Sequence, residues 1–215
     1  NMDGANEIVF HTDSSIYVLD GLANNYNGWP KLLEERVYNI GVGDFNGDEN
    51  NDIVFACDNG IKWVDGPNYS GGGWITNSST RDIFPIDMDN DGDIDILSAD
   101  IGVDDIMLYE NDGDENFTQN IIHGSSGGAR SIHAIDIDND NDIDVLFPNF
   151  DDGTIVLLEN VDGKQYGDGR LIRTFIKLLN QDLEGFGTNL TQSLEEFQGD
   201  MELLDDVTFF KAILG

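Results

Sequence analysis

One acidic stretch, residues 87–95, limits most strongly what this chain can fold into. It reads Asp-Met-Asp-Asn-Asp-Gly-Asp-Ile-Asp, so a carboxylate falls at every second position and a glycine at the sixth. Carboxylates this close repel one another unless a cation lies between them. Alternate oxygens can surround a hard cation such as calcium if the backbone turns sharply at the glycine. The stretch therefore predicts a metal-binding turn.

The acidic pattern occurs three times, and the segments after each copy are alike. Residues 44–52 and 136–144 repeat it, and short apolar runs separated by tight turns follow each copy. A further unit, without a complete acidic loop, opens the chain. The four units align at Glu7, Asp52, Asp95 and Asp144, which gives periods of 45, 43 and 49 residues. About four short strands within each period are typical of a propeller blade. The sequence thus predicts a mainly β fold with about four propeller-type blades over residues 1–170.

Two other calcium motifs fit less well. An EF-hand needs a glutamate at position 12 and flanking helices, whereas position 12 here is Phe55, Ser98 or Phe147 and the flanks are of β type. Calcium-binding β-helix repeats recur every nine residues. The long period favours blades.

Together, three motifs resemble the FG-GAP/VCBS repeats that form the blades of integrin α-subunit propellers and of many secreted bacterial surface proteins. These motifs are Gly43-Asp-Phe-Asn-Gly-Asp48, the stretch 87–95, and Leu108-Tyr-Glu-Asn-Asp-Gly113. The resemblance covers roughly residues 1–170. It implies a β-propeller with calcium, at about three sites, in the loop between the first and second strands of a blade.

The resemblance also implies the ligands, which are the side chains at loop positions 1, 3, 5 and 9 and the carbonyl at position 7. The corresponding residues are Asp44, Asn46, Asp48, Asn50 and Asp52, then Asp87, Asp89, Asp91, Asp93 and Asp95, and finally Asp136, Asp138, Asp140, Asp142 and Asp144. Two departures stand out. Position 6 is Glu49 or Asn141 in the outer loops, where the turn costs more than at glycine. Family propellers usually have about seven blades, and this chain has about four.

The character of the sequence changes after the repeats. Apolar residues at spacings of three and four predict an amphipathic helical segment over residues 171–206. Residues 207–215 read as a strand that resembles the first strand of a blade. The first blade lacks that strand, so we expect residues 207–215 to complete it, within the chain or in a neighbouring copy. Exchange between copies would give head-to-tail contacts, and thus a ring or a filament.

Charge and composition limit the classes of partner that this chain can bind. The net charge is −33, from 43 acidic and 10 basic residues, which argues against nucleic acid and anionic membrane surfaces as partners, because their phosphates would be repelled. No apolar run reaches the roughly 18 residues of a membrane span, and the opening residues do not have the pattern of a signal peptide. The chain opens at Asn1 rather than Met, which indicates a processed or trimmed product. Cys57 is the only cysteine. Glycosylation is possible at Asn68, Asn77, Asn116 and Asn189.

No set of residues indicates catalysis. Ser126 lies in a G-x-S-x-G pattern, but a strand rather than a helix follows it. We therefore predict a non-enzymatic, calcium-stabilised module of the cell surface or extracellular space that serves adhesion or assembly. Its partner would be another copy, a surface protein or a glycan. The first alternative is a carbohydrate-binding module ancillary to a polysaccharide-active enzyme, with Trp29, Trp63 or Trp74 stacking on sugars. The second is an enzyme in its own right.

Overall fold

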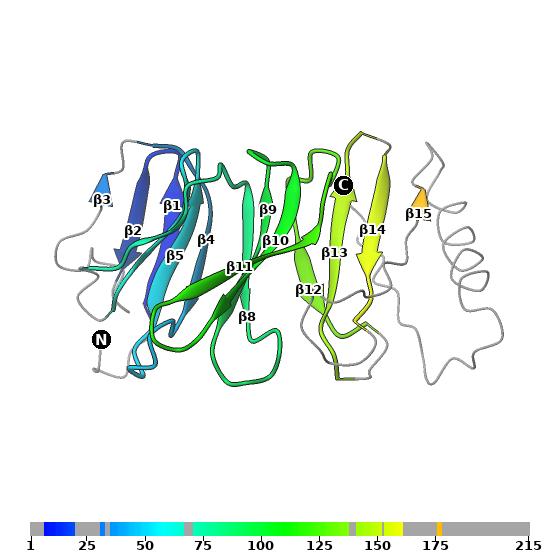
Figure 1. Cartoon of the computed structure of the whole chain (residues 1–215). Helices are drawn as coiled ribbons and strands as arrows, with labels where there is room; N and C mark the ends of the chain where they lie inside the picture. Colours follow the sequence, from blue (N-terminus) through cyan, green and yellow to red (C-terminus); the bar gives the residue numbers. More distant parts are fainter. Residues whose placement is uncertain are drawn as a thin grey trace.

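The computed structural model describes residues 7–19, 31–32, 35–66, 71–137, 141–151, 153–160 and 176–177. These residues form fifteen β-strands in four antiparallel sheets and contain no helix. The sheets stand side by side in chain order (Figure 1). Among the described residues, neighbouring sheets contact one another through β1 and β4, through β4 and β5 against β8, and through β8 and β12, which places the sheets in chain order. The same residues include no helix long and apolar enough to cross a bilayer.

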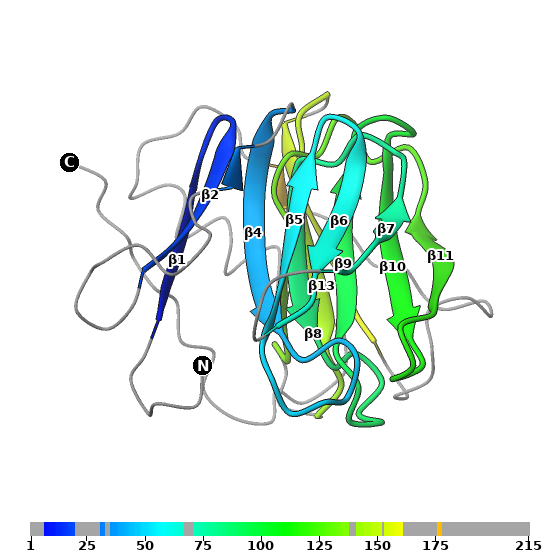
Figure 2. The same cartoon turned by 90° about the vertical axis from the view of Figure 1, so that its left-hand side faces the viewer.

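The two middle sheets are complete four-stranded units. The second sheet contains β4 (Val37–Gly43), β5 (Asp52–Cys57), β6 (Gly60–Val64) and β7 (Trp74–Thr76). The third sheet contains β8 (Asp82–Ile86), β9 (Asp95–Asp100), β10 (Asp105–Asn111) and β11 (Phe117–His123). In both sheets each strand pairs with the next along the chain, and Figure 2 shows β4 to β7 laid out in this order. Each acidic loop joins the first strand to the second, as predicted.

The outer sheets are shorter. The fourth contains β12 (His133–Ile135), β13 (Asp144–Asn149), β14 (Thr154–Leu158) and β15 (Ile176–Lys177). The first has only β1 (Ile8–Thr12), β2 (Ser15–Leu19) and β3 (Lys31–Leu32). Because β1 corresponds to β5 and β9, the described residues hold no counterpart of β4 in this sheet. This matches the predicted incomplete first blade.

The predicted helical segment needs a correction. Residues 176–177 form β15, with Ile176 opposite Ile155 and Lys177 opposite Thr154 on β14. Spacings of three and four describe the segment as a whole, but the free edge of β14 offers backbone partners that outweigh a local helical preference. The fourth sheet therefore continues beyond residue 170. The rest of the segment, and the strand predicted over 207–215, lie outside the described residues.

Apolar side chains fill the space between neighbouring sheets. Alternate residues of β5 serve two cores: Ile53 and Phe55 pack toward the first sheet, and Val54 packs toward the third. All six residues of β5 are buried, which explains its continuous apolar run. Trp63 is 4% exposed and belongs to the second of these cores. Trp63 therefore packs between the sheets, the more common role of tryptophan in such blades, and cannot stack on a sugar.

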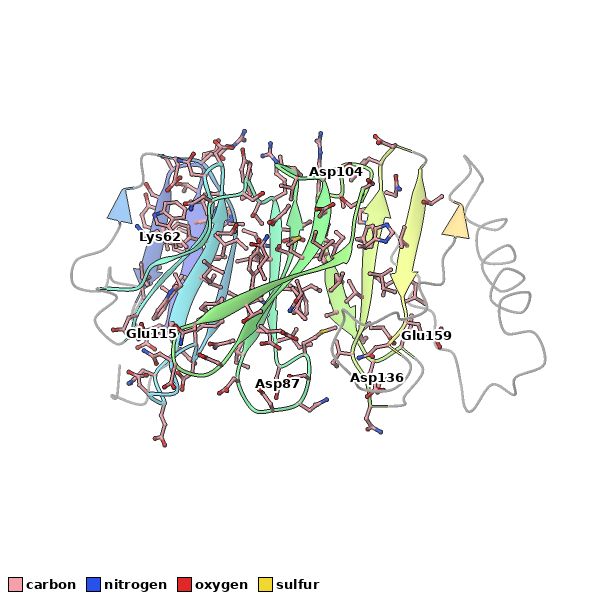
Figure 3. The ribbon with its side chains drawn as sticks, in the orientation of Figure 1. Lys62, Asp87, Asp104, Glu115, Asp136 and Glu159 are labelled. Carbon is pink, nitrogen blue, oxygen red and sulfur yellow. The ribbon has the colours of Figure 1, made fainter. Side chains whose placement is uncertain are left out.

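The two ends of the sheets differ in their connections. The acidic loops lie at one end, called here the loop end, where Figure 3 labels Asp87 and Asp136. The tight turns between the second and third strands of each sheet lie at the other end, called here the hairpin end, where Figure 3 labels Asp104. The acidic loops, which are the candidate metal sites, and the hairpin turns therefore lie at opposite ends of the sheets.

Candidate metal centre

The last carboxylate of each acidic loop holds the loop closed. Asp95 is 2% exposed, and its two oxygens accept the backbone N–H groups of Met88 (2.9 Å) and Asn111 (2.9 Å). The same two bonds recur at Asp52, from Phe45 (3.0 Å) and Gly66 (2.7 Å), and at Asp144, from Ile137 (2.9 Å) and Asn160 (2.8 Å). Position 9 therefore ties its own loop to the end of the third strand of the sheet.

The first carboxylate of each loop organises the turn. Asp87 accepts the N–H groups of Asp91 (3.1 Å) and Gly92 (3.1 Å). Asp44 and Asp136 likewise accept the N–H of position 6, at 2.8 and 3.0 Å. Position 6 has a positive φ in all three loops, 102° at Gly92, 67° at Glu49 and 73° at Asn141. The sharp turn predicted there is present, and Glu49 and Asn141 adopt it without being glycine.

Three carboxylates converge in the middle loop. Asp87, Asp89 and Asp95 each offer an oxygen, and these oxygens lie within 4.8 Å of one another. Calcium takes oxygens at about 2.3–2.6 Å, so oxygens across one ion lie up to about 5 Å apart. The group fits a hard cation. The structure thus brings together three of the four predicted side-chain ligands of this loop, and the side chain of Asp91 lies outside the group. The predicted role of the Asp93 carbonyl stays a prediction.

Burial and the neighbouring negative charges raise the pKa of two carboxyl groups in this loop. Burial raises the pKa of Asp95 to about 7, and the neighbouring charges of Asp89 and Asp91 add to the rise, against the lowering effect of its two N–H donors. Loss of hydration also raises the pKa of Asp93, together with the charges of Asp91 and Asp87. A site with these shifts favours a bound proton or a bound cation over a bare set of negative charges.

Loop 44–52 is less complete as a metal site than loop 87–95, and loop 136–144 is described only in part. In loop 44–52 asparagines stand at positions 3 and 7, and the Asn46 amide donates to Asp65 (3.1 Å). In loop 136–144, Asp138 and Asp140 lie outside the described residues, so their predicted role stays a prediction. The same holds for the ligand roles of Asp48, Asn50 and Asp142.

Sequence reasoning missed the part that Asn111 plays. Its side-chain amide donates to the carbonyls of Phe45 (3.0 Å) and Ile94 (3.2 Å), and so links loop 44–52 to loop 87–95. The signal was present in the sequence, because Glu-Asn recurs at the end of the third strand, at residues 110–111 and 159–160. The backbone N–H of the asparagine closes position 9 in both units.

The structure also describes two of the four predicted glycosylation sites and the serine of the G-x-S-x-G pattern. Asn77 and Asn116 are exposed, although the Asn116 amide donates to Asp112 (3.0 Å); Asn68 and Asn189 lie outside the described residues. Ser126 is 2% exposed and donates its hydroxyl to Asp104 (3.2 Å). This places the G-x-S-x-G pattern in a connection between the third and fourth sheets.

Comparison with one solved structure supports the fold, and two further structures are similar at lower scores. A lectin of Agrocybe aegerita that recognises non-reducing terminal N-acetylglucosamine has a TM-score of 0.52 at 16% identity, over 82% of this chain and 49% of the lectin. The V. cholerae biofilm matrix protein Bap1 gives 0.46 at 20% identity, over 74% and 25% of the two chains. An exo-β-1,3-galactanase of Phanerochaete chrysosporium gives 0.47 at 10% identity, over 79% and 49%. The chain thus spans less than half of each protein.

Comparisons of sequence bear on the repeats. No curated protein matches the chain. Residues 87–147, however, match the model of the FG-GAP-like repeat. This segment includes the middle acidic loop with its three converging carboxylates, all of the strands β9 to β12, and the first residues of β13. The resemblance to FG-GAP-type repeats that the sequence indicates is therefore confirmed over residues 87–147.

Proposed function

We propose that this chain is a calcium-stabilised, non-enzymatic module of the cell surface or extracellular space, and that its rigid sheets serve adhesion or assembly. The observation that carries the proposal is the convergence of Asp87, Asp89 and Asp95 within a loop whose backbone the first and last carboxylates already hold. These three side chains would hold the ion. Calcium would neutralise their charge and fix the connection between β8 and β9.

The calcium affinity typical of extracellular modules fits the proposed extracellular location. Extracellular calcium modules bind with dissociation constants of about 10⁻⁴ to 10⁻³ M. At about millimolar calcium, each such site adds roughly 0.4–1.4 kcal/mol to the free energy of unfolding. At the far lower calcium of a cell interior the same site would stay empty and the charges would repel. For a chain with a net charge of −33, bound calcium therefore adds most to the free energy of unfolding where calcium is plentiful.

The test is thermal unfolding together with molar mass by light scattering, in millimolar calcium and in excess EGTA, with negative-stain images of the same samples. We expect a higher melting temperature in calcium and, for an assembly subunit, larger ordered particles that EGTA disperses. Magnesium at the same concentration is the control, since it demands a smaller octahedral site. Identical melting in calcium and EGTA would refute the calcium role.

The edge of β1 that no described strand covers is the contact that we propose for assembly. Ile8 and Phe10 on this strand are 54% and 39% exposed, and each of the other three sheets has a further strand at the corresponding edge. Residues 207–215 resemble that strand in sequence, so they are the proposed occupant, from the same chain or a neighbouring copy. Deletion of residues 207–215 should lower stability or abolish the particles. Unchanged melting and unchanged mass would rule this contact out.

A glycan partner is the second candidate. The lectin that shares this fold recognises a terminal sugar, and Trp74 on β7 is 44% exposed with the Lys62 ammonium 5.5 Å from its ring centroid. An exposed indole face of this kind can stack on a sugar ring. A glycan array followed by tryptophan quenching tests the idea. Trp74→Ala should abolish quenching by the sugar, and Trp74→Phe should retain part of the binding.

A further inference from the structure

Three arginines stand ahead of the first strands of successive sheets. Arg36 directly precedes β4, Arg81 directly precedes β8, and Arg130 lies three residues before β12. Arg81 and Arg130 share one position relative to the acidic loop that follows them, and Arg36 lies two residues further from its loop. The structure describes four basic side chains, Arg36, Lys62, Arg81 and Arg130. Three of these four thus lie close to the start of a first strand, in a chain that has few cations.

Hydrogen bonds bring the starts of these strands together. The buried carboxylate of Asp82, the first residue of β8, accepts the side-chain amide of Asn39 on β4. Its other oxygen accepts the backbone N–H of Ile132, next to β12, at 2.8 Å. The backbone of Arg36 also bonds to a hairpin turn, since its carbonyl accepts the N–H of Asp58 at 3.2 Å. The arginines therefore lie at the hairpin end, opposite the acidic loops.

Aromatic rings accompany the guanidinium groups. Arg36 and Arg81 both approach the ring of Tyr38, at 5.4 and 3.7 Å from its centroid. Arg130 lies 5.7 Å from the ring centroid of Phe150, which is 60% exposed. Among the described residues, the one ion pair that these arginines make joins Arg36 to Asp13 at 3.5 Å, and both side chains are exposed. Two of the three guanidinium groups thus have no carboxylate partner among those residues.

We propose that this hairpin end binds the uronic acid residues of an acidic polysaccharide. An arginine presents a planar pair of donors that matches a carboxylate, and the open ring of Phe150 offers an apolar face to the C–H groups of the same sugar. The proposal names the partner class of the adhesion function and rests on that function.

Two other anionic partners fit the surface less well. An acidic segment of a second copy, or an acidic peptide, satisfies the arginines but makes no use of the exposed ring of Phe150. A polysaccharide with one carboxylate per sugar carries both the charge and the apolar face.

The experiment is isothermal titration with trigalacturonic acid in millimolar calcium, with its methyl ester as the uncharged probe. The acid should bind at least tenfold more tightly than the ester, because a hydrogen bond between charged groups is worth about 1.5–3 kcal/mol. Arg81→Gln and Arg130→Gln together should weaken the acid by tenfold or more, and Arg130→Gln alone tests the site without disturbing Tyr38. Phe150→Ala should weaken binding, and Phe150→Tyr should restore it.

Gln119→Glu is the matched control for net charge, because it adds one negative charge at an exposed position of β11 near the loop end and should leave binding unchanged. Equal affinity for acid and ester, or full affinity in the arginine variants, would overturn the proposal. Binding of polyglutamate in place of the sugar would also overturn it, and so would loss of sugar binding in Gln119→Glu alone. The same holds if the arginine variants disperse particles while the parent chain binds no sugar. The calcium-dependent rise in melting temperature is measured on every variant. If calcium raises the melting temperature but the sugar does not bind, only this site is refuted. If calcium does not raise the melting temperature of the parent chain, the proposed function is refuted.

Discussion

Loops 44–52 and 87–95 share one backbone frame, that is, the same hydrogen bonds to the carboxylates at positions 1 and 9. They differ in the carboxylates that this frame brings together. In both, the carboxylate at position 9 accepts two N–H groups and the carboxylate at position 1 accepts the N–H of position 6. Only loop 87–95 gathers three carboxylates, since position 3 is Asp89 there and Asn46 in the other loop. The difference indicates that a closed loop does not by itself gather three carboxylates: positions 1 and 9 close both loops, and the residue at position 3 decides whether a third carboxylate joins them.

The largest expected effect tests the shared frame. Asp52→Ala and Asp95→Ala each leave two buried N–H groups without an acceptor, at about 1–3 kcal/mol per group. In EGTA we therefore expect both variants to lose about 2–5 kcal/mol of unfolding free energy, measured by urea denaturation. In calcium, Asp95→Ala should lose more than Asp52→Ala. A loss below about 1 kcal/mol for Asp52→Ala would show that its two hydrogen bonds do not hold the loop.

The pH dependence of the metal-free protein should differ between the two loops. The pKa of Asp95 is raised to about 7, above the roughly 3.9 of an unfolded aspartate. The folded state therefore holds this proton more tightly, so the contribution is full below about pH 4 and is lost as the pH rises through about 7.

In EGTA, the free energy of unfolding should fall by roughly 1–3 kcal/mol between pH 5 and pH 8 from this group. Asp95→Asn should flatten that fall, measured by urea titrations at each pH. Asp52→Asn is the comparison, since burial raises the pKa of Asp52 as well. Equal slopes in the parent chain and in Asp95→Asn would show that Asp95 is not the group that titrates.

Exchange of position 3 should exchange the metal affinity. Asp89→Asn gives the middle loop the residue of the first loop, and we expect calcium to bind about tenfold more weakly, or about 1.4 kcal/mol. Asn46→Asp should strengthen calcium binding at loop 44–52. Isothermal titration with calcium measures both, and Asp114→Asn, an exposed acidic residue outside the three-carboxylate group, serves as the control for net charge. Equal losses in Asp89→Asn and Asp114→Asn would assign the effect to overall charge.

Much of this arrangement could be predicted from the sequence because the repeat fixes local structure. The period located the sheets, and the alternation of carboxylates located the loops and the turn at position 6. The pairing of β15 could not be predicted, because Ile176 and Lys177 pair with β14 through backbone groups that no side-chain pattern reveals. The link from Asn111 to Phe45 joins residues 66 positions apart. The shorter first sheet, by contrast, could be predicted, because the opening repeat has no counterpart of the first strand in sequence and none is found among the described residues of that sheet.

The smallest expected effect concerns the turn itself. Glu49 adopts a φ of 67° that glycine adopts without strain, so Glu49→Gly should raise the unfolding free energy by about 0.5–1 kcal/mol, after the greater entropy of glycine in the unfolded chain is subtracted. Glu115→Gly, at the same φ in the loop between β10 and β11, is the matched control for a purely backbone effect. Gly92→Ala should act in the opposite direction, because φ is 102° there. Urea denaturation in EGTA separates these effects from metal binding. A destabilised Glu49→Gly protein would mean that the Glu49 side chain stabilises loop 44–52 by more than its backbone strain costs, and the frame would then differ between the two loops as well.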